Sequence, residues 1–232
     1  MTRVTIDVGG TFTDCLVVDE AGEVHEFKAQ TTPADPALGL IRVLDKAAAH
    51  FGLGLPQFMA NVGLLIAHGT TLSTNALLTG RTAKVGLLTT DGFRDTIQIR
   101  LGYKNIHTSR FNLFVPPYRA LVPRHLRLGV RERVLTTGEI LTPLREEDVY
   151  AAIEAFMKEN VEAVAICFLH SYVNPEHERR VAAICRREMP GVYVTASHEV
   201  LPVFREYERF STTVVSAAVG PITERYLKTM TE

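Results

Sequence analysis

The chain has 232 residues, 46% of them hydrophobic and 22% charged, which is enough apolar material for a substantial core. This composition excludes intrinsic disorder, collagen and coiled coil. Lys and Arg (25 residues) nearly balance Asp and Glu (26 residues), and the formal net charge of −1 argues against nucleic acid as a partner.

Hydropathy and cysteine usage indicate the compartment. No apolar run approaches the roughly 18 residues that span a bilayer, and the start, MTRVTIDVGG, lacks the pattern of a signal peptide. Cys15, Cys167 and Cys185 lie far apart without a CxxC motif, so they indicate neither a disulfide framework nor a thiolate metal site. We expect three core cysteines, no membrane partner and a cytoplasmic location.

The first 52 residues predict a strand meander followed by a helix. Residues 3–8 alternate between apolar and polar side chains, which predicts a strand, and residues 14–19 and 23–30 predict two more. The short connections between them favour antiparallel pairing. Pro36 then begins a helix with apolar residues at helical spacing, and Gly52 ends it.

Strands and helices alternate from residue 61 onward. The pattern predicts strands at 64–68, 83–89, 163–169 and 192–196, and helices at 70–79, 146–158 and 175–189, with another beginning in 91–96. Asn174 is expected to cap the helix at 175–189, with Pro175 as its first residue. This order predicts a βαβ unit and a partly parallel sheet. No helix is predicted between 100 and 144, and one long helix is predicted from Pro202, kinked or interrupted at Gly220–Pro221.

The segment DVGGTFTD, residues 7–14, carries the strongest chemical signal. Its two glycines would let the backbone approach a phosphate, and its two threonines add hydroxyl groups beside backbone N–H donors. Asp7 and Asp14 flank the loop, where a carboxylate can hold Mg²⁺ directly or through water. The loop leads into a strand and not into a helix, which excludes a Walker A loop and a dinucleotide-binding GxGxxG motif. The sequence predicts a phosphate-binding β-hairpin; the alternative is a tight hairpin whose polar residues merely face solvent.

Motifs along the whole chain resemble the hydantoinase A/5-oxoprolinase family. The matching stretches, which occur in the expected order, are DVGGTFTD (7–14), HGTTLSTNALL (68–78), TTDGFRD (89–95), LVPR (121–124), FLHSYVNPEHERR (168–180) and REYERFSTTVVSAAVGP (205–221). The first of them also resembles the first phosphate loop of the actin/hexokinase/Hsp70 ATPase superfamily.

The resemblance implies an α/β fold of the ribonuclease H-like type. In this fold an actin-like ATPase lobe has a mixed sheet and an N-terminal phosphate-binding β-hairpin. Residues 1–200 would form the N-terminal region of the family, and residues 201–232 would begin a second, hydantoinase A region. The resemblance further implies a second lobe that completes the ATP site. No second DxGGT motif follows residue 14, so we expect the chain to be an N-terminal piece that is inactive by itself.

The resemblance also implies an ATP-dependent cyclic amide hydrolase that phosphorylates an amide or carbonyl oxygen before ring opening, with Mg²⁺ or Mn²⁺. Segments 121–134 and 142–148 are more similar to an acetone carboxylase subunit, so the ATP-binding subunit of a ketone-activating carboxylase is the alternative. A non-enzymatic nucleotide-binding module is a third reading. The expected partners are a small cyclic amide or ketone and a hydantoinase B-like subunit.

Residue roles carried over from the family fall on two motifs. Asp7 would coordinate the metal, Asp14 would orient the loop or the waters of the metal, and both would serve catalysis. The phosphates would be cradled by Gly9, Gly10, Thr11 and Thr13. The substrate or another anion would be contacted at the strand-to-helix junction by His68, Thr70, Thr71 and Asn75. Plain capping of the helix by Thr70 or Thr71 is the alternative for that junction.

Three further polar groups have structural and functional interpretations. Arg94 and Asp95 form either a local ion pair or part of a substrate wall. The spacing of His170, Tyr172 and His177 is not that of a metal site, so we expect capping and packing there. The charges at 205–209 allow helical ion pairs, with a hinge or subunit contact as the alternative.

Overall fold

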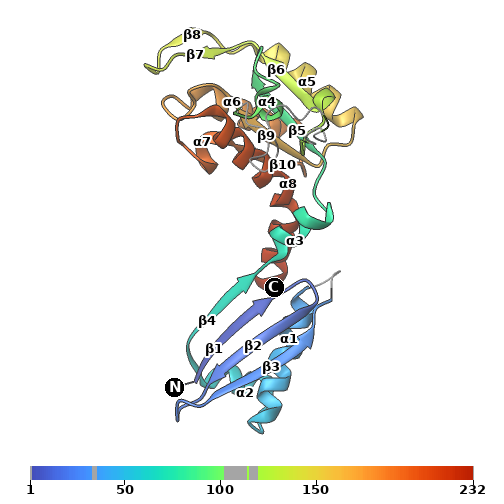
Figure 1. Cartoon of the computed structure of the whole chain (residues 1–232), viewed down its shortest axis with the longest axis vertical. Helices are drawn as coiled ribbons and strands as arrows, with labels where there is room; N and C mark the ends of the chain where they lie inside the picture. Colours follow the sequence, from blue (N-terminus) through green and yellow to red (C-terminus); the bar gives the residue numbers. More distant parts are fainter. Residues whose placement is uncertain (1, 33–35, 102–113, 115–119, 232) are drawn as a thin grey trace. The chain divides into compact units, whose positions relative to one another are not determined.

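The computed structural model describes residues 2–32, 36–101, 114 and 120–231 (Figure 1). They divide into a first unit, residues 1–81 with 222–232, and a second unit, residues 82–221. Each unit has a hydrophobic core of its own. Within the described ranges, no helix combines the length and apolarity needed to cross a membrane.

The first unit is built on a mixed sheet of four strands. These are β1 (Thr2–Val8), β2 (Phe12–Val18), β3 (Val24–Gln30) and β4 (Val62–Thr70), in the order β3-β2-β1-β4. The first three strands pair antiparallel, which confirms the predicted meander, and β4 lies parallel to β1. Because Val8 pairs with Thr70, the end of β1 lies beside the end of β4.

Helices complete the first unit. Helix α1 (Pro36–His50) contacts β2 and β3, and its Val43, Leu44 and Ala47 are buried with Val4 and Ile6 of β1. Helix α2 (Leu55–Asn61), which the sequence pattern does not predict, buries Phe58 in the same core. Helix α3 (Leu72–Thr79) follows β4 and ends at Gly80, whose left-handed φ of 68° closes the last turn.

The second unit contains a parallel sheet in the order β10-β9-β5-β6. Its strands are β5 (Val85–Thr90), β6 (Arg127–Val130), β9 (Ala163–Cys167) and β10 (Tyr193–Ala196). Every residue of β5 and of β9 is buried, as expected for central strands of a parallel sheet. Around it lie α4 (Thr96–Ile99), the short 3-10 helix η1 (Arg124–Leu126), the hairpin of β7 (Arg133–Val134) and β8 (Ile140–Thr142), α5 (Glu146–Lys158), α6 (Glu176–Glu188) and α7 (Ser197–Val200). Helix α8 (Glu206–Thr231) belongs to this unit as far as Pro221, and its remaining residues belong to the first unit.

The boundaries of several helices differ from the sequence prediction. Helix α3 begins at Leu72 and not at Thr70, which is the last residue of β4. Helix α4 begins only at Thr96. Helix α6 begins at Glu176 with Pro175 as N-cap, although the Asn174 side chain still accepts a hydrogen bond from the Glu176 N–H, at 3.1 Å. Helix α8 begins at Glu206 because Arg205 has a left-handed φ of 74°, and it continues through Pro221 without interruption.

The segment 100–144, in which the sequence predicts no helix, contains only the three-residue 3-10 helix η1 among its described helical residues. It also contains β6, β7 and β8, which the sequence pattern does not reveal because each has only two to four residues. Residues 102–113 and 115–119 of this segment lie outside the described residues. The βαβ unit of β9, α6 and β10, by contrast, is confirmed as parallel.

Candidate functional site

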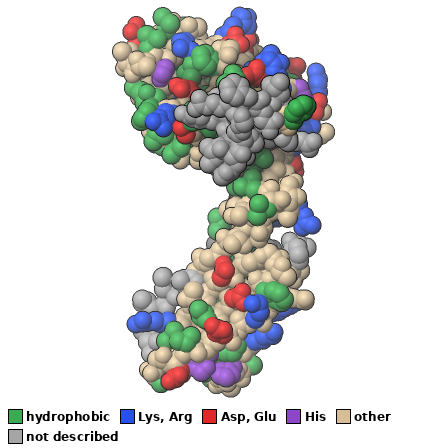
Figure 2. Space-filling model, viewed as in Figure 1, with side chains coloured by type: hydrophobic (Ala, Val, Ile, Leu, Met, Phe, Trp, Pro, Cys, Tyr) green, Lys and Arg blue, Asp and Glu red, His purple; other side chains and the backbone are tan. Residues whose placement is uncertain are grey.

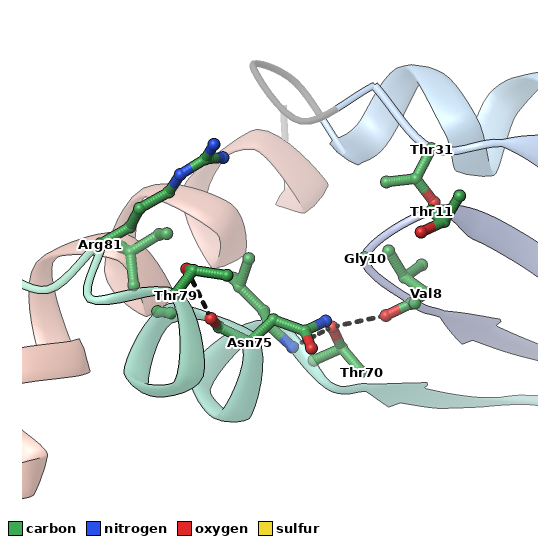
Figure 3. Close-up of a pocket in the computed structure, with 12 residues that line it drawn as sticks. Val8, Gly10, Thr11, Thr31, Thr70, Asn75, Thr79 and Arg81 are labelled. Carbon is green, nitrogen blue, oxygen red and sulfur yellow. Dashed lines mark hydrogen bonds between the residues drawn. The ribbon is translucent and has the colours of Figure 1, made fainter.

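A pocket of about 320 Å³ lies in the first unit, between the β1–β2 loop and the β4–α3 junction (Figure 3). Five residues predicted from sequence line it: Gly9, Gly10, Thr11, Thr70 and Asn75. Three polar residues without a predicted role also line it: Thr31, Thr79 and Arg81. The apolar part of the wall consists of Val8, Leu72, Ala76 and Ile222. The structure thus brings the two predicted motifs to one cavity, although about 60 residues separate them.

The two loop glycines are required for space. Neither has a left-handed φ. The Gly9 N–H donates to the Phe12 carbonyl at 3.0 Å, and a Cβ on Gly9 would lie 2.9 Å from that oxygen. A Cβ on Gly10 would lie 2.7 Å from Nδ2 of Asn75. A side chain at either position would collide with a neighbouring group, the Phe12 carbonyl or the Asn75 amide, which explains why both residues are glycine.

The junction is tied to the end of β1 by hydrogen bonds. Thr70 Oγ1 donates to the Val8 carbonyl at 3.0 Å and accepts from the Leu72 N–H at 3.2 Å. The Thr71 N–H donates to the same Val8 carbonyl at 3.2 Å. Thr70 therefore satisfies one N–H of the first turn of α3 while its side chain lines the pocket.

Asn75 projects from α3 toward the loop that carries Gly10 (Figure 3). Its Nδ2 donates to Thr71 Oγ1 at 3.0 Å, which fixes the amide one turn from the start of the helix. Thr79 lies one turn further on, and its hydroxyl donates to the Asn75 carbonyl at 2.7 Å. Helical spacing from Asn75 is the sequence signal that could have identified Thr79.

The two aspartates share the exposed face of the sheet beside the pocket. Asp7 and Asp14 are direct partners in the β1–β2 ladder, so both side chains point to the same side. Asp14 forms an ion pair with Lys28 at 2.8 Å. For Asp7, no hydrogen bond or ion pair to another described residue is found, and its Oδ1 lies 3.4 Å from where a Cβ on Gly69 would be.

This donor set fits Mg²⁺ held jointly by protein and phosphates. Mg²⁺ keeps several waters and uses one or two carboxylates together with substrate phosphates. Among the described residues, no group of three or more His, Cys, Asp or Glu could hold a metal by itself. Asp7, which is unpaired among the described residues, can supply the carboxylate ligand. It lies next to Val8, and the pocket wall contains Val8, Gly9 and Gly10.

Thr13 and His68 point elsewhere. Thr13 is buried, and its hydroxyl lies 2.9 Å from that of Thr31. His68 Nε2 lies 2.6 Å from the hydroxyl of Tyr226, and the two rings stack with centroids 5.8 Å apart. Burial raises the pKa of Tyr226. Neither Thr13 nor His68 lines the pocket, and Thr13 contacts a residue that does, Thr31.

The polar groups of the second unit form internal networks. His177 Nδ1 lies 2.8 Å from Glu132 Oε2, with both side chains buried, and Thr90 donates to the other oxygen of Glu132. Arg209, also buried, donates to the Phe168 and Val203 carbonyls, both at 2.9 Å. These contacts agree with the structural interpretation of His177. Of the charges at 205–209, Arg205 and Glu208 form an (i, i+3) ion pair at 3.5 Å as predicted, whereas Arg209 binds backbone carbonyls.

The partners of Asp95 differ from the predicted ones. Its carboxylate pairs with Arg124 at 2.9 Å and with Arg127 at 3.4 Å, so the ion pair spans about 30 residues and does not form with the adjacent Arg94. The hydrogen bond from Arg124 holds the pKa of Asp95 below its ordinary value. Asp95 therefore joins α4 to the segment around η1.

The three cysteines are buried and free, as expected. Burial raises the pKa of Cys15 to about 11 and that of Cys185 to about 12, and it raises the pKa of Cys167 well above its ordinary value. All three thiols are therefore protonated at neutral pH. Figure 2 shows both acidic and basic side chains on the visible face of each unit.

Comparison with known proteins decides the family. The profile of the hydantoinase/oxoprolinase N-terminal region matches residues 3–189. The chain belongs to this family. The resemblance inferred from its motifs is thereby confirmed.

Relatives within the hydantoinase/oxoprolinase family include enzymes with different substrates. The alpha subunit of caprolactamase from Pseudomonas jessenii is 43% identical over 226 residues, covering 97% of this chain and 32% of the relative. The crystal structure of ATP-dependent caprolactamase from the same organism matches with a TM-score of 0.87 and 42% identity, covering 99% of this chain and 33% of that one. A nucleotide-free acetone carboxylase structure matches with a TM-score of 0.84 and 32% identity, covering 100% and 34%. The chain thus spans about a third of the length of these relatives.

Proposed function

We propose that this chain is the ATP-binding N-terminal part of a cyclic amide hydrolase of the hydantoinase/5-oxoprolinase type, which phosphorylates an amide or carbonyl oxygen before ring opening. The observation that carries the proposal is the pocket in which Gly10 and Thr11 of the glycine loop face Thr70 and Asn75. Caprolactamase, the relative at 43% identity, is described as ATP-dependent and is named for a lactam substrate.

The residues around the pocket are suited to three roles: binding phosphate, holding a metal ion and contacting the substrate. Backbone N–H groups of Gly10 and Thr11 are donors suited to phosphate oxygens, whereas the Gly9 N–H donates to the Phe12 carbonyl and holds the loop closed. Asp7 would hold Mg²⁺ together with waters and phosphates, and the ion would neutralise charge on the phosphoryl group during transfer. Asn75 presents an amide able to donate to a carbonyl oxygen, next to apolar Leu72 and Ala76. Asp14, paired with Lys28, would orient the loop.

The strand arrangement supports a finer fold proposal. We propose that the first unit is a ribonuclease H-like lobe of the actin-like ATPases, because three antiparallel strands and a parallel β4, in the order β3-β2-β1-β4, match that fold. We further propose that residues 201–232 begin the hydantoinase A region of the protein. The family profile ends at residue 189, which is compatible with a boundary near 200.

Two relatives are named as subunits of larger assemblies, which supports a partner subunit for this protein. The caprolactamase relative is an alpha subunit, and an acetone carboxylase beta subunit from Xanthobacter autotrophicus is 36% identical over 225 residues. We propose that the protein works in a hetero-oligomer with a hydantoinase B-like subunit. The buried, reduced cysteines favour the cytoplasm as its location.

Substrate-dependent phosphate release tests the proposal. The complete protein, with its partner subunit, is incubated with Mg-ATP and a lactam, hydantoin, 5-oxoproline or acetone with bicarbonate. Phosphate release with a ring-opened product supports the proposal. A carboxylated product would instead support the carboxylase reading, which the acetone carboxylase match keeps as the second candidate. ATP binding without substrate-dependent release would indicate a nucleotide-binding module.

A further inference from the structure

Arg81 is the charged side chain in the pocket wall. Every other described residue that lines the pocket is neutral, whether apolar, glycine, threonine or asparagine. Figure 3 places Arg81 on the α3 side, across the cavity from Thr11 and Thr31. The pocket therefore has hydroxyl and backbone donors on one wall and a guanidinium on the other.

The end of α3 fixes this position. Gly80 adopts a left-handed φ of 68°, which turns the chain back over the last helical turn. The Arg81 N–H then donates to the Ala76 carbonyl at 2.9 Å. Ala76 itself lines the pocket, so the closing turn of the helix anchors the Arg81 backbone directly at the cavity.

No neighbour among the described residues compensates the charge of Arg81. Several other basic residues do have carboxylate partners: Lys28 pairs with Asp14 at 2.8 Å and Arg131 with Asp148 at 2.5 Å. For Arg81, no ion pair or side-chain hydrogen bond to another described residue is found, and none of the described residues that line the pocket is acidic. A guanidinium in this setting matches the two oxygens of a carboxylate or phosphate group.

We propose that Arg81 is an anion-binding residue that contacts an anionic oxygen of the ligand held between the glycine loop and α3. The inference rests on the proposed function and extends it. The anionic group is either a phosphate of the nucleotide or a carboxylate carried by the substrate. The structural alternative is that Arg81 only offsets the partial negative charge at the C-terminus of α3.

Charge-removing and charge-conserving variants test the inference in the complete protein. Arg81→Gln keeps a long polar side chain without charge, Arg81→Lys keeps the charge, and Arg3→Gln removes a charge from an exposed site at the opposite end of β1. Titration calorimetry measures the affinity for Mg-ATP and for inorganic pyrophosphate. If Arg81 binds phosphate, we expect Arg81→Gln to weaken both by roughly tenfold or more, Arg81→Lys to weaken them less, and Arg3→Gln to leave them unchanged.

The second arm distinguishes the source of the anion. If Arg81 binds a substrate carboxylate, Arg81→Gln raises the KM for 5-oxoproline by roughly tenfold or more, while the KM for neutral caprolactam and the ATP affinity stay unchanged. Unchanged affinities and KM values in Arg81→Gln, with only its melting temperature lowered, would overturn the inference in favour of the helix-end role. Equal losses in Arg3→Gln would overturn it as well. A wild-type protein that binds pyrophosphate through Arg81 but not ATP would instead refute the proposed function.

Discussion

Replacing Gly10 by alanine tests the geometry of the pocket directly. The new Cβ would lie 2.7 Å from Nδ2 and 3.3 Å from Cγ of Asn75, closer than side chains tolerate. Because φ of Gly10 is not left-handed, we expect no backbone strain of that kind from alanine. The amide of Asn75 is the far end of a flexible side chain, so it is the group that moves.

The structure sets the size of the effect. Displacing the amide breaks its 3.0 Å hydrogen bond to Thr71 Oγ1, a loss of about 0.5–1.5 kcal/mol. Restricting the unfolded chain with alanine returns about 0.4–1 kcal/mol. The free energy of unfolding should therefore change by about 1 kcal/mol or less. Binding should suffer more, because the new methyl group lies on the phosphate-binding loop itself and crowds the pocket between that loop and Asn75, and we expect ATP affinity to fall by roughly tenfold or more.

A double-mutant cycle with Asn75→Ala separates the clash from other causes. Urea denaturation measures stability and calorimetry measures ATP affinity. In the Asn75→Ala background, Gly10→Ala should cost less stability, with a coupling of at least about 0.5 kcal/mol. Gly9→Ala is the matched control, since its Cβ would meet the backbone oxygen of Phe12, which cannot rotate away, and should destabilise more. Wild-type ATP affinity in Gly10→Ala, or strictly additive effects in the cycle, would refute the reasoning.

Three further predictions address other groups. In the complete protein, Asp7→Ala should lower ATP turnover by roughly a hundredfold or more, about 3 kcal/mol in activation free energy. The circular dichroism spectrum should stay unchanged, because Asp7 is on the exposed face of β1. Near-normal phosphate release would refute the metal role. The hydrogen bond from Arg131 lowers the pKa of Asp148 from 3.8 to about 2, so its ionised form stabilises the fold above about pH 4 and this contribution is lost as the pH falls toward 2. Asp148→Asn should therefore lower the melting temperature at pH 6, with a difference from wild type that shrinks between pH 4 and pH 2; a constant difference across that window would contradict the linkage. Finally, a thiol reagent at pH 8 should label the native chain slowly and label all three cysteines in denaturant, because each is buried with a raised pKa; rapid labelling of the native chain would contradict their core placement.

Elements in which buried and exposed residues alternate regularly could be predicted from the sequence alone. Alternation over residues 3–8 predicted β1, helical spacing from Pro36 predicted α1, and apolar runs predicted β5 and β9, because each pattern records locally which side of the element is buried. The sequence also determined the family, since the motifs occur in order along the chain. Elements without a local period, namely α2, α7 and β6–β8, were not predicted.

Which residues line the pocket could be seen only in the tertiary structure. Thr11 and Thr13 look equivalent in the sequence, but Thr11 lies in the loop and lines the pocket, whereas Thr13 lies in β2 and is buried against Thr31. The sequence suggested that the loop glycines let the backbone approach a phosphate, and the structure adds that Gly10 is needed because Asn75, 65 positions later, approaches it. Parallel pairing of β1 with β4 brings Asn75 to the loop, and the left-handed turn at Gly80 adds Arg81. Strand pairing between distant segments leaves no periodic trace in either segment, so residues that depend on it cannot be identified from local pattern.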